Sequence, residues 1–143
     1  MRLTQFTDYA LRLLIYAAAH PDRLVTIEET AAAYGISRNH LMRIANLLTR
    51  EDFLRAVRGR SGGLMLARAP EFIGLGHVVR STEPDFAIAE CFGDTYQCRL
   101  TPSCRLKGIL GTALTAFLNE MDRHTLADLV LDPAQFGIER PAI

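Results

Sequence analysis

Three cysteines lie close together in the second half of the chain, and their chemistry is the most informative in the sequence. Cys91, Cys98 and Cys104 fall within fourteen residues and are separated by six and five residues. An odd number of cysteines argues against a disulfide framework, and the lack of a Cys-x-x-Cys pair argues against a zinc ribbon. Their immediate neighbours are mostly polar, which is not typical of core cysteines. The three thiols therefore indicate a soft metal site.

An iron–sulfur cluster suits this spacing better than a single zinc ion. A cluster is wider than one ion, so its thiolate ligands can be spread along a flexible loop. A zinc site and plain free thiols remain the alternatives. Cys104 is expected in the first turn of a long helix, where the helix dipole favours a thiolate. A cubic four-iron cluster would need a fourth ligand in addition to the three cysteines.

The cysteines are predicted to lie in or beside an irregular loop, residues 83–100, between a short helix over about 72–82 and a long helix. Thr101 is expected to cap the long helix, with Pro102 at its first position and its end near Arg123. Apolar residues recur along it at helical spacing: Leu106, Ile109, Leu110, Ala113, Leu114, Phe117, Leu118 and Met121. A helix of this kind, about 35 Å long, is too large for the rest of the chain to cover. We therefore expect two copies to pair along it as a homodimer; packing within one subunit is the alternative.

Three helices are predicted in the first half of the chain, over residues 5–19, 26–34 and 37 to about 50. Each begins with a residue suited to an N-cap. These residues are Thr7, Thr26 in a capping box with Glu29, and Ser37. Gly35 provides a tight turn between the second and third helices. A short helix, a glycine turn and a further helix have the spacing of a helix-turn-helix.

Polar residues gather at the start of the third predicted helix, where helix-turn-helix proteins contact base edges. Its apolar residues, Ile36, Leu41, Ile44, Leu47 and Leu48, are expected to face the core, which leaves the polar residues Arg38, Asn39, His40, Arg43 and Asn46 on the other side. Asn39 and His40 are candidates to contact base edges, whereas Arg38 and Arg43 are candidates to contact bases or phosphates. The alternative is an ordinary amphipathic helix pair with a solvated polar face.

A β-hairpin is predicted directly after this helix. Residues 53–57 and 64–67 read as two strands, joined by a turn that contains Arg58 and Arg60 among three glycines. Glycines let a backbone approach phosphate closely, and an arginine at such a tip can enter a narrow minor groove. The hairpin is therefore interpreted as the wing of a winged helix-turn-helix, and a merely solvated basic turn is the alternative.

Charge is distributed unevenly although the net charge is zero. Residues 1–80 contain 11 Lys and Arg against 7 Asp and Glu, whereas residues 81–143 contain 5 against 9. This asymmetry fits a DNA-binding part joined to a sensing or pairing part. Of the 16 cations 15 are arginine, a residue suited to phosphate and guanine, although genomic base composition would also explain the bias.

The predicted architecture is mainly α: a winged helix-turn-helix with a β-hairpin wing and a long C-terminal dimerisation helix. Residues 1–80 are assigned to the DNA-binding region. Residues 81–143 are assigned to the cluster-binding loop and dimerisation helix, followed by a short helix over 125–130 and an irregular tail from Pro133, and the two regions are expected to form one intertwined unit. The four histidines are scattered without a nucleophile–base pattern, so we expect no enzyme. We find neither a signal peptide nor a membrane-spanning run and expect a cytoplasmic protein that binds no membrane.

Several segments resemble the winged-helix iron–sulfur transcription regulators of the NsrR/IscR/RirA type, and the resemblance covers almost the whole chain. The segments that carry it are residues 1–4, 6–12, 34–41, 57–63, 101–107 and 124–130. It implies a cytoplasmic homodimeric repressor that binds a double-stranded DNA operator. It also implies an iron–sulfur cluster, a [4Fe-4S] cluster rather than the alternative [2Fe-2S].

Within this family the sequence is most similar to the nitric-oxide-sensing type. Thr7-Asp8-Tyr9 resembles the segment in which an aspartate supplies the fourth cluster ligand from the partner subunit, which implies that role for Asp8. Lys107 stands where the cluster-assembly type has a histidine ligand. A surface ion pair between Asp8 and Arg12 is the alternative interpretation of Asp8.

The resemblance implies that nitric oxide destroys the cluster by nitrosylation and so lowers DNA affinity. Residues 86–92 instead resemble the iron-responsive type, and the spacing of Cys91 and Cys98 is slightly long for the nitric-oxide-sensing type. An iron-responsive regulator and a zinc-stabilised winged-helix regulator therefore remain the alternatives.

Overall fold

The computed structural model describes residues 1–95, 97–100 and 103–136, which form a mainly helical fold with one small sheet. The helices are α1 (Gln5–Ala19), α2 (Ile27–Tyr34), α3 (Arg38–Arg50), α4 (Leu75–Thr82) and α5 (Arg105–Asp122), and the strands are β1 (Leu54–Val57) and β2 (Gly63–Leu66). Short 3-10 turns cover Pro70–Phe72, Glu90–Phe92, Leu126–Leu129 and Pro133–Phe136. The predicted fold class, a mainly α winged helix-turn-helix, is confirmed.

Helix α1 has the predicted bounds but a different cap. Thr4, not Thr7, is the N-cap: its backbone is extended, and its hydroxyl accepts a hydrogen bond from the Thr7 N–H at 3.3 Å. The Thr4 carbonyl accepts the N–H of Asp8 at 3.0 Å, so the helical ladder already begins at Thr4. The prediction for Thr7 was wrong because Thr7 is fully buried inside the first turn.

The predicted helix-turn-helix is formed by α2 and α3. Thr26 and Glu29 make the expected capping box at the start of α2, and Gly35 ends α2 in the left-handed conformation at φ 64°. The Ser37 hydroxyl then accepts the N–H of His40 at 3.4 Å and so caps α3. Each sequence signal in this motif is therefore confirmed.

A Gly35→Ala variant is expected to lose about 1–2 kcal/mol of unfolding free energy, because left-handed backbone is disfavoured for residues with a Cβ. No atom lies within 4 Å of the position that a Cβ would take, so backbone conformation alone carries the cost. Gly35→Asn is the matched control and should lose less, since asparagine tolerates this conformation. Denaturant unfolding measures both, and equal stability of wild type and Gly35→Ala would contradict the argument.

The two strands form the predicted hairpin. They pair antiparallel with Leu54 opposite Leu66 and Val57 opposite Gly63, which leaves residues 58–62 as the tip. Val25, ahead of α2, exchanges two backbone hydrogen bonds with Leu64, at 2.9 and 2.7 Å, and so ties the hairpin to the start of the helix-turn-helix. The wing is therefore held at its base by the same segment that leads into α2.

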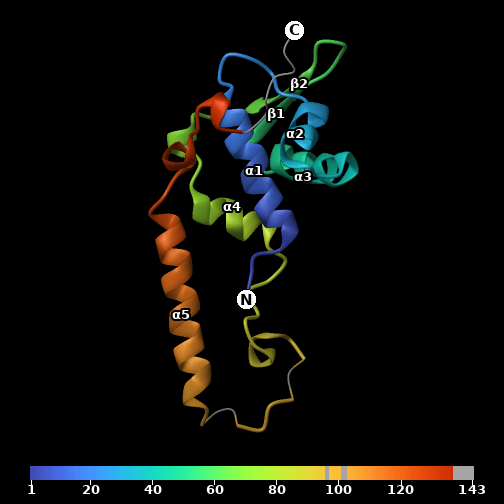
Figure 1. Ribbon diagram of the computed structural model, residues 1–143. Coiled ribbons are helices and arrows are strands. Elements are labelled where there is room, and N and C mark those ends of the chain that lie inside the picture. The colour runs from blue at the N-terminus through green and yellow to red at the C-terminus, as the bar shows by residue number, and fades with distance from the viewer. Residues whose placement is uncertain (96, 101–102, 137–143) are drawn as a thin grey trace.

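Helix α1 is the centre of the hydrophobic core and lies between α3 and α4 in Figure 1. The core residues it contributes are Ala10, Leu13, Leu14, Tyr16, Ala17 and Ala18. From α3 come Leu41, Ile44, Ala45 and Leu48, and from the segments around them Phe53, Leu54, Ile73, Val78 and Leu126. Because Leu126 belongs to this core, the chain after α5 returns to the winged-helix region.

The two predicted regions are joined through α4. Helix α4 starts later than predicted, because Ile73 has extended backbone (φ −106°) and separates α4 from the 3-10 turn at Pro70–Phe72. Backbone hydrogen bonds join Leu126 to Ile73 (2.8 Å) and Leu75 to His124 (3.0 Å). Arg80 of α4 also pairs with Asp122 at the end of α5, with Nη2 and Oδ2 2.8 Å apart. The C-terminal end of α5 is thus firmly attached to the body.

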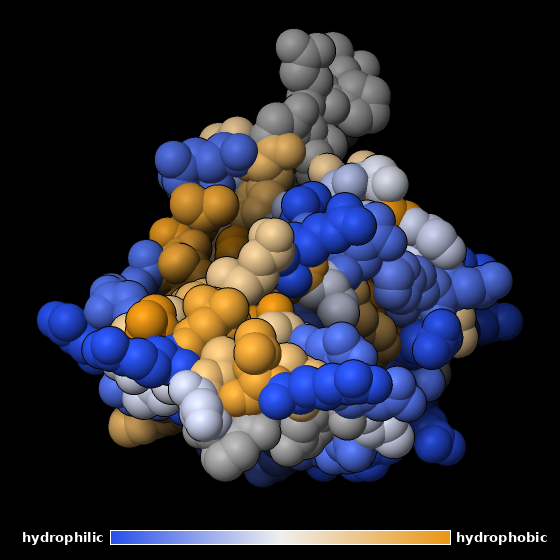
Figure 2. Space-filling model, turned by 90° about the horizontal axis from the view of Figure 1, so that it is seen from below, coloured by the Kyte–Doolittle hydropathy of each residue, from blue (hydrophilic) through white to orange (hydrophobic). Residues whose placement is uncertain are grey.

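Helix α5 leaves the body as a single projecting rod (Figure 1), and none of its residues is buried. It has 18 residues and is about 27 Å long. The predicted start was wrong, because α5 begins at Arg105 with Cys104 as its N-cap; Thr101 and Pro102 lie outside the described residues. Figure 2 shows that a broad hydrophobic area is exposed on the face of the molecule seen from below.

The segment that follows α5 packs back onto α1. The predicted helix over 125–130 is a single 3-10 turn, Leu126–Leu129, which Thr125 and Asp128 stabilise as a capping box. Pro133–Phe136 forms another turn instead of the predicted irregular tail, and the Phe136 ring lies 5.2 Å from that of Tyr16. The predicted tail beyond these residues lies outside the described part of the chain.

Candidate nucleic-acid interface and metal site

The exposed face of α3 carries the polar residues expected to contact DNA. Arg38, Asn39 and Arg43 are exposed, whereas Leu41, Ile44 and Leu48 on the opposite face are buried. Asn46 is exposed and extends this polar face; Leu47, expected to face the core, is only partly buried. The polar face of α3 is therefore exposed to solvent, as the spacing predicted.

Met42 is a surface residue of α3 that sequence reasoning missed. Its side chain is 44% exposed although it is apolar, and it lies one helical turn after Arg38 and beside Arg43. Apolar side chains on a recognition helix can contact the methyl group of thymine. A hydrophobicity pattern places methionine in the core by default, so only the structure reveals this position.

His40 differs from the other polar residues at the start of α3. Its ring lies 5.2 Å from that of Tyr9 and 6.2 Å from that of Phe6, both on α1, and the side chain is half-buried. Packing against α1 therefore fixes the orientation of this imidazole. Only part of the ring remains available to a ligand.

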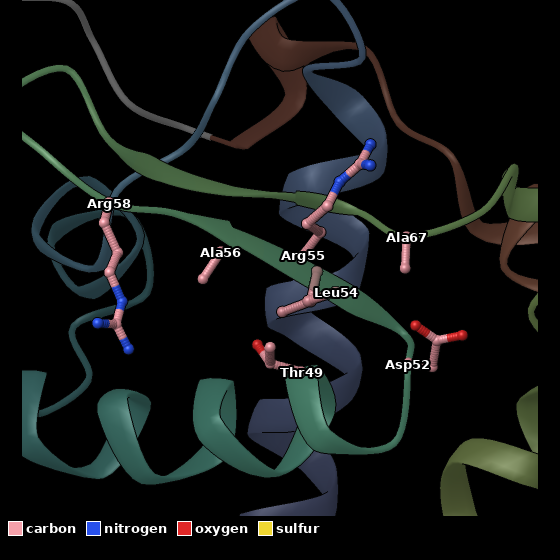
Figure 3. Close-up of a pocket in the computed structure, with 7 residues that line it drawn as sticks. All are labelled: Thr49, Asp52, Leu54, Arg55, Ala56, Arg58 and Ala67. Carbon is pink, nitrogen blue, oxygen red and sulfur yellow. The ribbon is translucent and has the colours of Figure 1, made fainter.

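The wing lies beside α3 and leaves a groove between them (Figure 3). The groove has a volume of about 410 Å³ and is lined by Thr49, Asp52, Leu54, Arg55, Ala56, Arg58 and Ala67. Side chains alternate along a strand, so Leu54, Ala56 and Arg58 point towards α3 while Arg55 points to the other side of the hairpin (Figure 3). Arg60 is exposed at the tip. Arg58 of the wing and Thr49 near the end of α3 thus line the same groove.

The three cysteines are free and half-buried, in or next to the segment that connects α4 to α5. Cys91 lies in the 3-10 turn Glu90–Phe92, and the Phe92 ring of this turn packs on α5. The Lys107 Nζ lies 5.9 Å from the centroid of this ring, and a Cβ added to Gly111 would lie 3.9 Å from it. Cys104 is the residue before α5. The segment around Cys91 therefore folds back on the N-terminal half of the helix that Cys104 begins.

Asp8 is engaged within its own subunit. The Arg12 guanidinium donates two hydrogen bonds to its carboxylate, from Nε at 3.0 Å and from Nη2 at 2.9 Å. The Asp8 side chain remains 44% exposed, so it is accessible from outside the subunit. The structure thus contains the surface ion pair that the sequence offered as the alternative interpretation of Asp8.

No group of three His, Cys, Asp or Glu side chains in the described residues converges closely enough to hold a metal ion. The three thiols are nevertheless a donor set that fits an iron–sulfur cluster, because thiolates are the usual ligands of such clusters. The structure brings Cys91 and Cys104 to the same part of α5 without closing a site, and it does not bring Asp8 to them within one chain.

Comparison with known proteins identifies the protein family of this chain. Residues 3–132 match the Rrf2 family, described as iron-dependent transcriptional regulators. The chain belongs to the Rrf2 family. It is 44% identical over 134 residues to the HTH-type transcriptional regulator NsrR of Bacillus licheniformis, covering 92% of this chain and 94% of that protein. It is 46% identical over 132 residues to NsrR of Halalkalibacterium halodurans, covering 91% and 90%.

Solved structures share the fold of this Rrf2-family chain. T. potens IscR superimposes with a TM-score of 0.70 at 20% identity over 100% of this chain and 93% of that one. The oxidised form of Staphylococcus aureus CymR gives a TM-score of 0.71 at 23% identity over 88% and 93%. The Rrf2-family chain is a DNA-binding transcriptional regulator and not an enzyme, as its sequence predicted. In the described residues, none of the helices has the length and apolar character needed to cross a membrane.

Proposed function

We propose that this Rrf2-family regulator is a cytoplasmic homodimeric repressor. Its affinity for operator DNA depends on a bound iron–sulfur cluster, and nitric oxide lowers this affinity by reacting with the cluster. The outward-facing polar side of α3 beside an arginine-bearing wing is the observation that carries the DNA-binding part. Nitric oxide as the signal is suggested by the similarity to two regulators named NsrR.

Specific residues are assigned to DNA on the basis of their exposure. Asn39 and the exposed edge of His40 would contact base edges, while Arg38 and Arg43 would contact bases or phosphates. Ser37, exposed at the N-cap of α3, is suited to a backbone phosphate because helix N-termini favour anions. Arg58 and Arg60 of the wing would contact the backbone or the minor groove.

Pairing of two copies along α5 is supported by the exposure of its apolar side chains. Ile109 is 64% exposed and Leu106 is 59% exposed, although both belong to the apolar stripe of an 18-residue helix. A shallow groove of about 550 Å³ runs beside them and is lined by Arg105, Gly108, Ile109, Thr112, Ala113 and Ala116. Small residues along such a groove allow a second helix to approach closely. Residues 1–80 would then contact DNA while residues 81–143 pair, as one intertwined unit.

The cluster is assigned to Cys91, Cys98 and Cys104, with Asp8 of the partner subunit as fourth ligand and [4Fe-4S] as the cluster type. When bound, such a cluster supplies iron atoms that react with nitric oxide. Asp8 is half-exposed on α1 of the winged-helix region, so its contact with the partner's cysteine segment would link the orientation of one DNA-binding region to the other subunit. Arg12, which holds Asp8 in the single chain, would release the carboxylate when that contact forms.

An Arg60→Ala variant tests the role of the wing. Loss of one phosphate or groove contact is expected to weaken operator binding and to reduce the slope of log affinity against log salt by about 1. Fluorescence anisotropy at several salt concentrations measures both. Iron content and dimer size should stay unchanged, because the tip of the hairpin lies far from the cysteine segment and from α5 (Figure 1).

Arg55→Ala is the matched control on the same hairpin, since Arg55 lies within β1 and not at the tip, and its side chain points away from α3 (Figure 3). It should bind the operator almost as wild type does. If Arg60→Ala bound with wild-type affinity and slope, the wing would not contact DNA. Separate exposure of the purified protein to nitric oxide and to an iron chelator, under anaerobic conditions, distinguishes a nitric-oxide signal from an iron signal.

A further inference from the structure

Two adjacent acidic residues begin α2, and they have different partners. Glu29 is held inside the domain: it accepts hydrogen bonds from the Tyr16 hydroxyl at 3.1 Å and the Thr26 N–H at 3.1 Å, and pairs with Arg23 at 2.7 Å. Hydrogen bonds from Arg23 and the Thr26 backbone lower the pKa of Glu29 despite the opposing effect of burial. Glu29 therefore has a structural role that accounts for its charge.

Glu28 has no such network of partners and instead reaches from α2 to the start of α3, the helix proposed to contact DNA. Its Oε1 lies 2.9 Å from Nη2 of Arg38, the first residue of α3. The side chains are 61% and 64% exposed, so this ion pair contributes little to stability, at most about 1 kcal/mol. A carboxylate at this place also repels DNA phosphates. The helix dipole also favours an acid in the first turn of α2 by at most about 1 kcal/mol, so stability gives only a modest reason for an acidic residue here.

We propose that Glu28 is a specificity-determining residue that positions Arg38 for a base edge. An exposed arginine at the start of a recognition helix can turn either to a phosphate, which carries no sequence information, or to a guanine, which does. Glu28 restrains the guanidinium through Nη2 and leaves its other N–H groups available. The negative charge of Glu28 also repels a DNA phosphate that approaches Arg38, so a contact between Arg38 and phosphate becomes less favourable. The inference rests on the proposed DNA-binding role of α3.

The geometry of the motif supports this role. Glu28 is in the first turn of α2 and Arg38 in the first turn of α3, and both helices have well-defined caps at Thr26 and Ser37. The two backbones are therefore fixed relative to each other across the Gly35 turn, and the ion pair joins two rigid elements. The restraint on Arg38 consequently comes from the helix that does not itself enter the groove.

The test uses the full-length, cluster-loaded protein and a duplex that this protein selects from a random-sequence pool. Affinity is measured for this duplex, for each single-base-pair variant of it and for a random duplex, at several salt concentrations. The proteins compared are wild type, Glu28→Gln, Arg38→Ala and the double variant. Glu51→Gln is the matched control, because it removes the same charge at the other end of α3.

Arg38→Ala identifies the base pair that Arg38 determines, as the position where its sequence preference is lost. At this base pair Glu28→Gln is expected to lower discrimination about three- to tenfold, part of what one good arginine–guanine contact provides. The Glu28→Gln variant should also bind the random duplex more tightly than wild type. Its slope of log affinity against log salt should be about 1 steeper, because Arg38 then contacts a phosphate. In the Arg38→Ala background, Glu28→Gln should change discrimination no further, and Glu51→Gln should leave it unchanged.

Unchanged discrimination in Glu28→Gln would overturn the proposal even if overall affinity rose, because the acid would then act only through its charge. An equal loss of discrimination in Glu51→Gln would overturn it as well. If Arg38→Ala altered no sequence preference, the role of Glu28 would be refuted. If Asn39→Ala and Arg43→Ala then also bound the operator as wild type does, the proposed DNA-binding function of α3 would fail with it.

Discussion

An Ile109→Glu variant is expected to be a folded monomer that binds its operator at least about 100-fold more weakly than wild type, since two linked binding regions gain that much from each other. Ile109 is 64% exposed in the single chain, so the change disturbs little intrachain packing. In the proposed dimer the same position is covered by the partner helix. A carboxylate placed there would be buried without a partner, which strongly disfavours association.

Analytical ultracentrifugation and operator binding measure the two effects together. Thr115→Glu is the matched control: it places the same charge on the same helix at an exposed position that does not line the groove along α5. This control should remain a dimer and bind as wild type does. A dimeric Ile109→Glu protein with full affinity would show that α5 is not the pairing surface, and the apolar exposure would then require another partner.

Local signals in the winged helix were sufficient to predict its structure. The capping box at Thr26, the glycine at position 35 and the cap at Ser37 each act within a few residues, so their outcome does not depend on the rest of the fold. The hairpin followed for the same reason, since alternation and glycines act locally. The cap of α1 failed because Thr4 and Thr7 are both good capping residues. A tertiary contact favours Thr4, whose N–H and hydroxyl both donate to Glu83, at 2.8 and 3.0 Å.

Features that depend on tertiary packing could not be predicted from local patterns. His40 looked like a free polar residue, but its ring packs on Tyr9 and Phe6 from a helix more than thirty residues earlier in the chain. The turn at Pro133–Phe136 looked irregular, yet Phe136 finds an aromatic surface of Tyr16 and Tyr34. Burial in this region raises the pKa of Tyr34 to about 12. The partner of Glu28 could not be predicted either, because nine residues, including the turn at Gly35, lie between it and Arg38.

The candidate metal site shows a different limit. The sequence predicted three cysteine ligands and one aspartate, and the structure of one chain places the segment around Cys91 against α5 and leaves Asp8 bound to Arg12. A site shared between two subunits cannot close within a single chain. Asp8 can complete the proposed site only from the partner subunit, and in the described residues the three thiols of one chain do not themselves converge on one point.

A Cys104→Ala variant tests that proposal most directly. Loss of a ligand is expected to lower the affinity for the cluster by more than about 100-fold, since loss of even an outer-shell partner typically costs 10- to 100-fold. Protein purified without oxygen should then lack most of its iron and its visible absorption. Operator affinity should fall at least tenfold if the cluster holds the two DNA-binding regions at the right distance, because two recognition helices must be about 34 Å apart to enter successive grooves.

The Cys104→Ala substitution should remove the thiol without disturbing helix α5. Cys104 is the N-cap of α5, but its side chain accepts no capping hydrogen bond, so alanine should leave the helix intact. Ser103→Ala, one residue earlier and exposed, is the control and should keep iron, colour and affinity. Circular dichroism and dimer size check the fold of both variants. If Cys104→Ala lost its iron yet bound the operator as tightly as wild type, DNA binding would not depend on the cluster; if it kept a full complement of iron, Cys104 would not be a ligand.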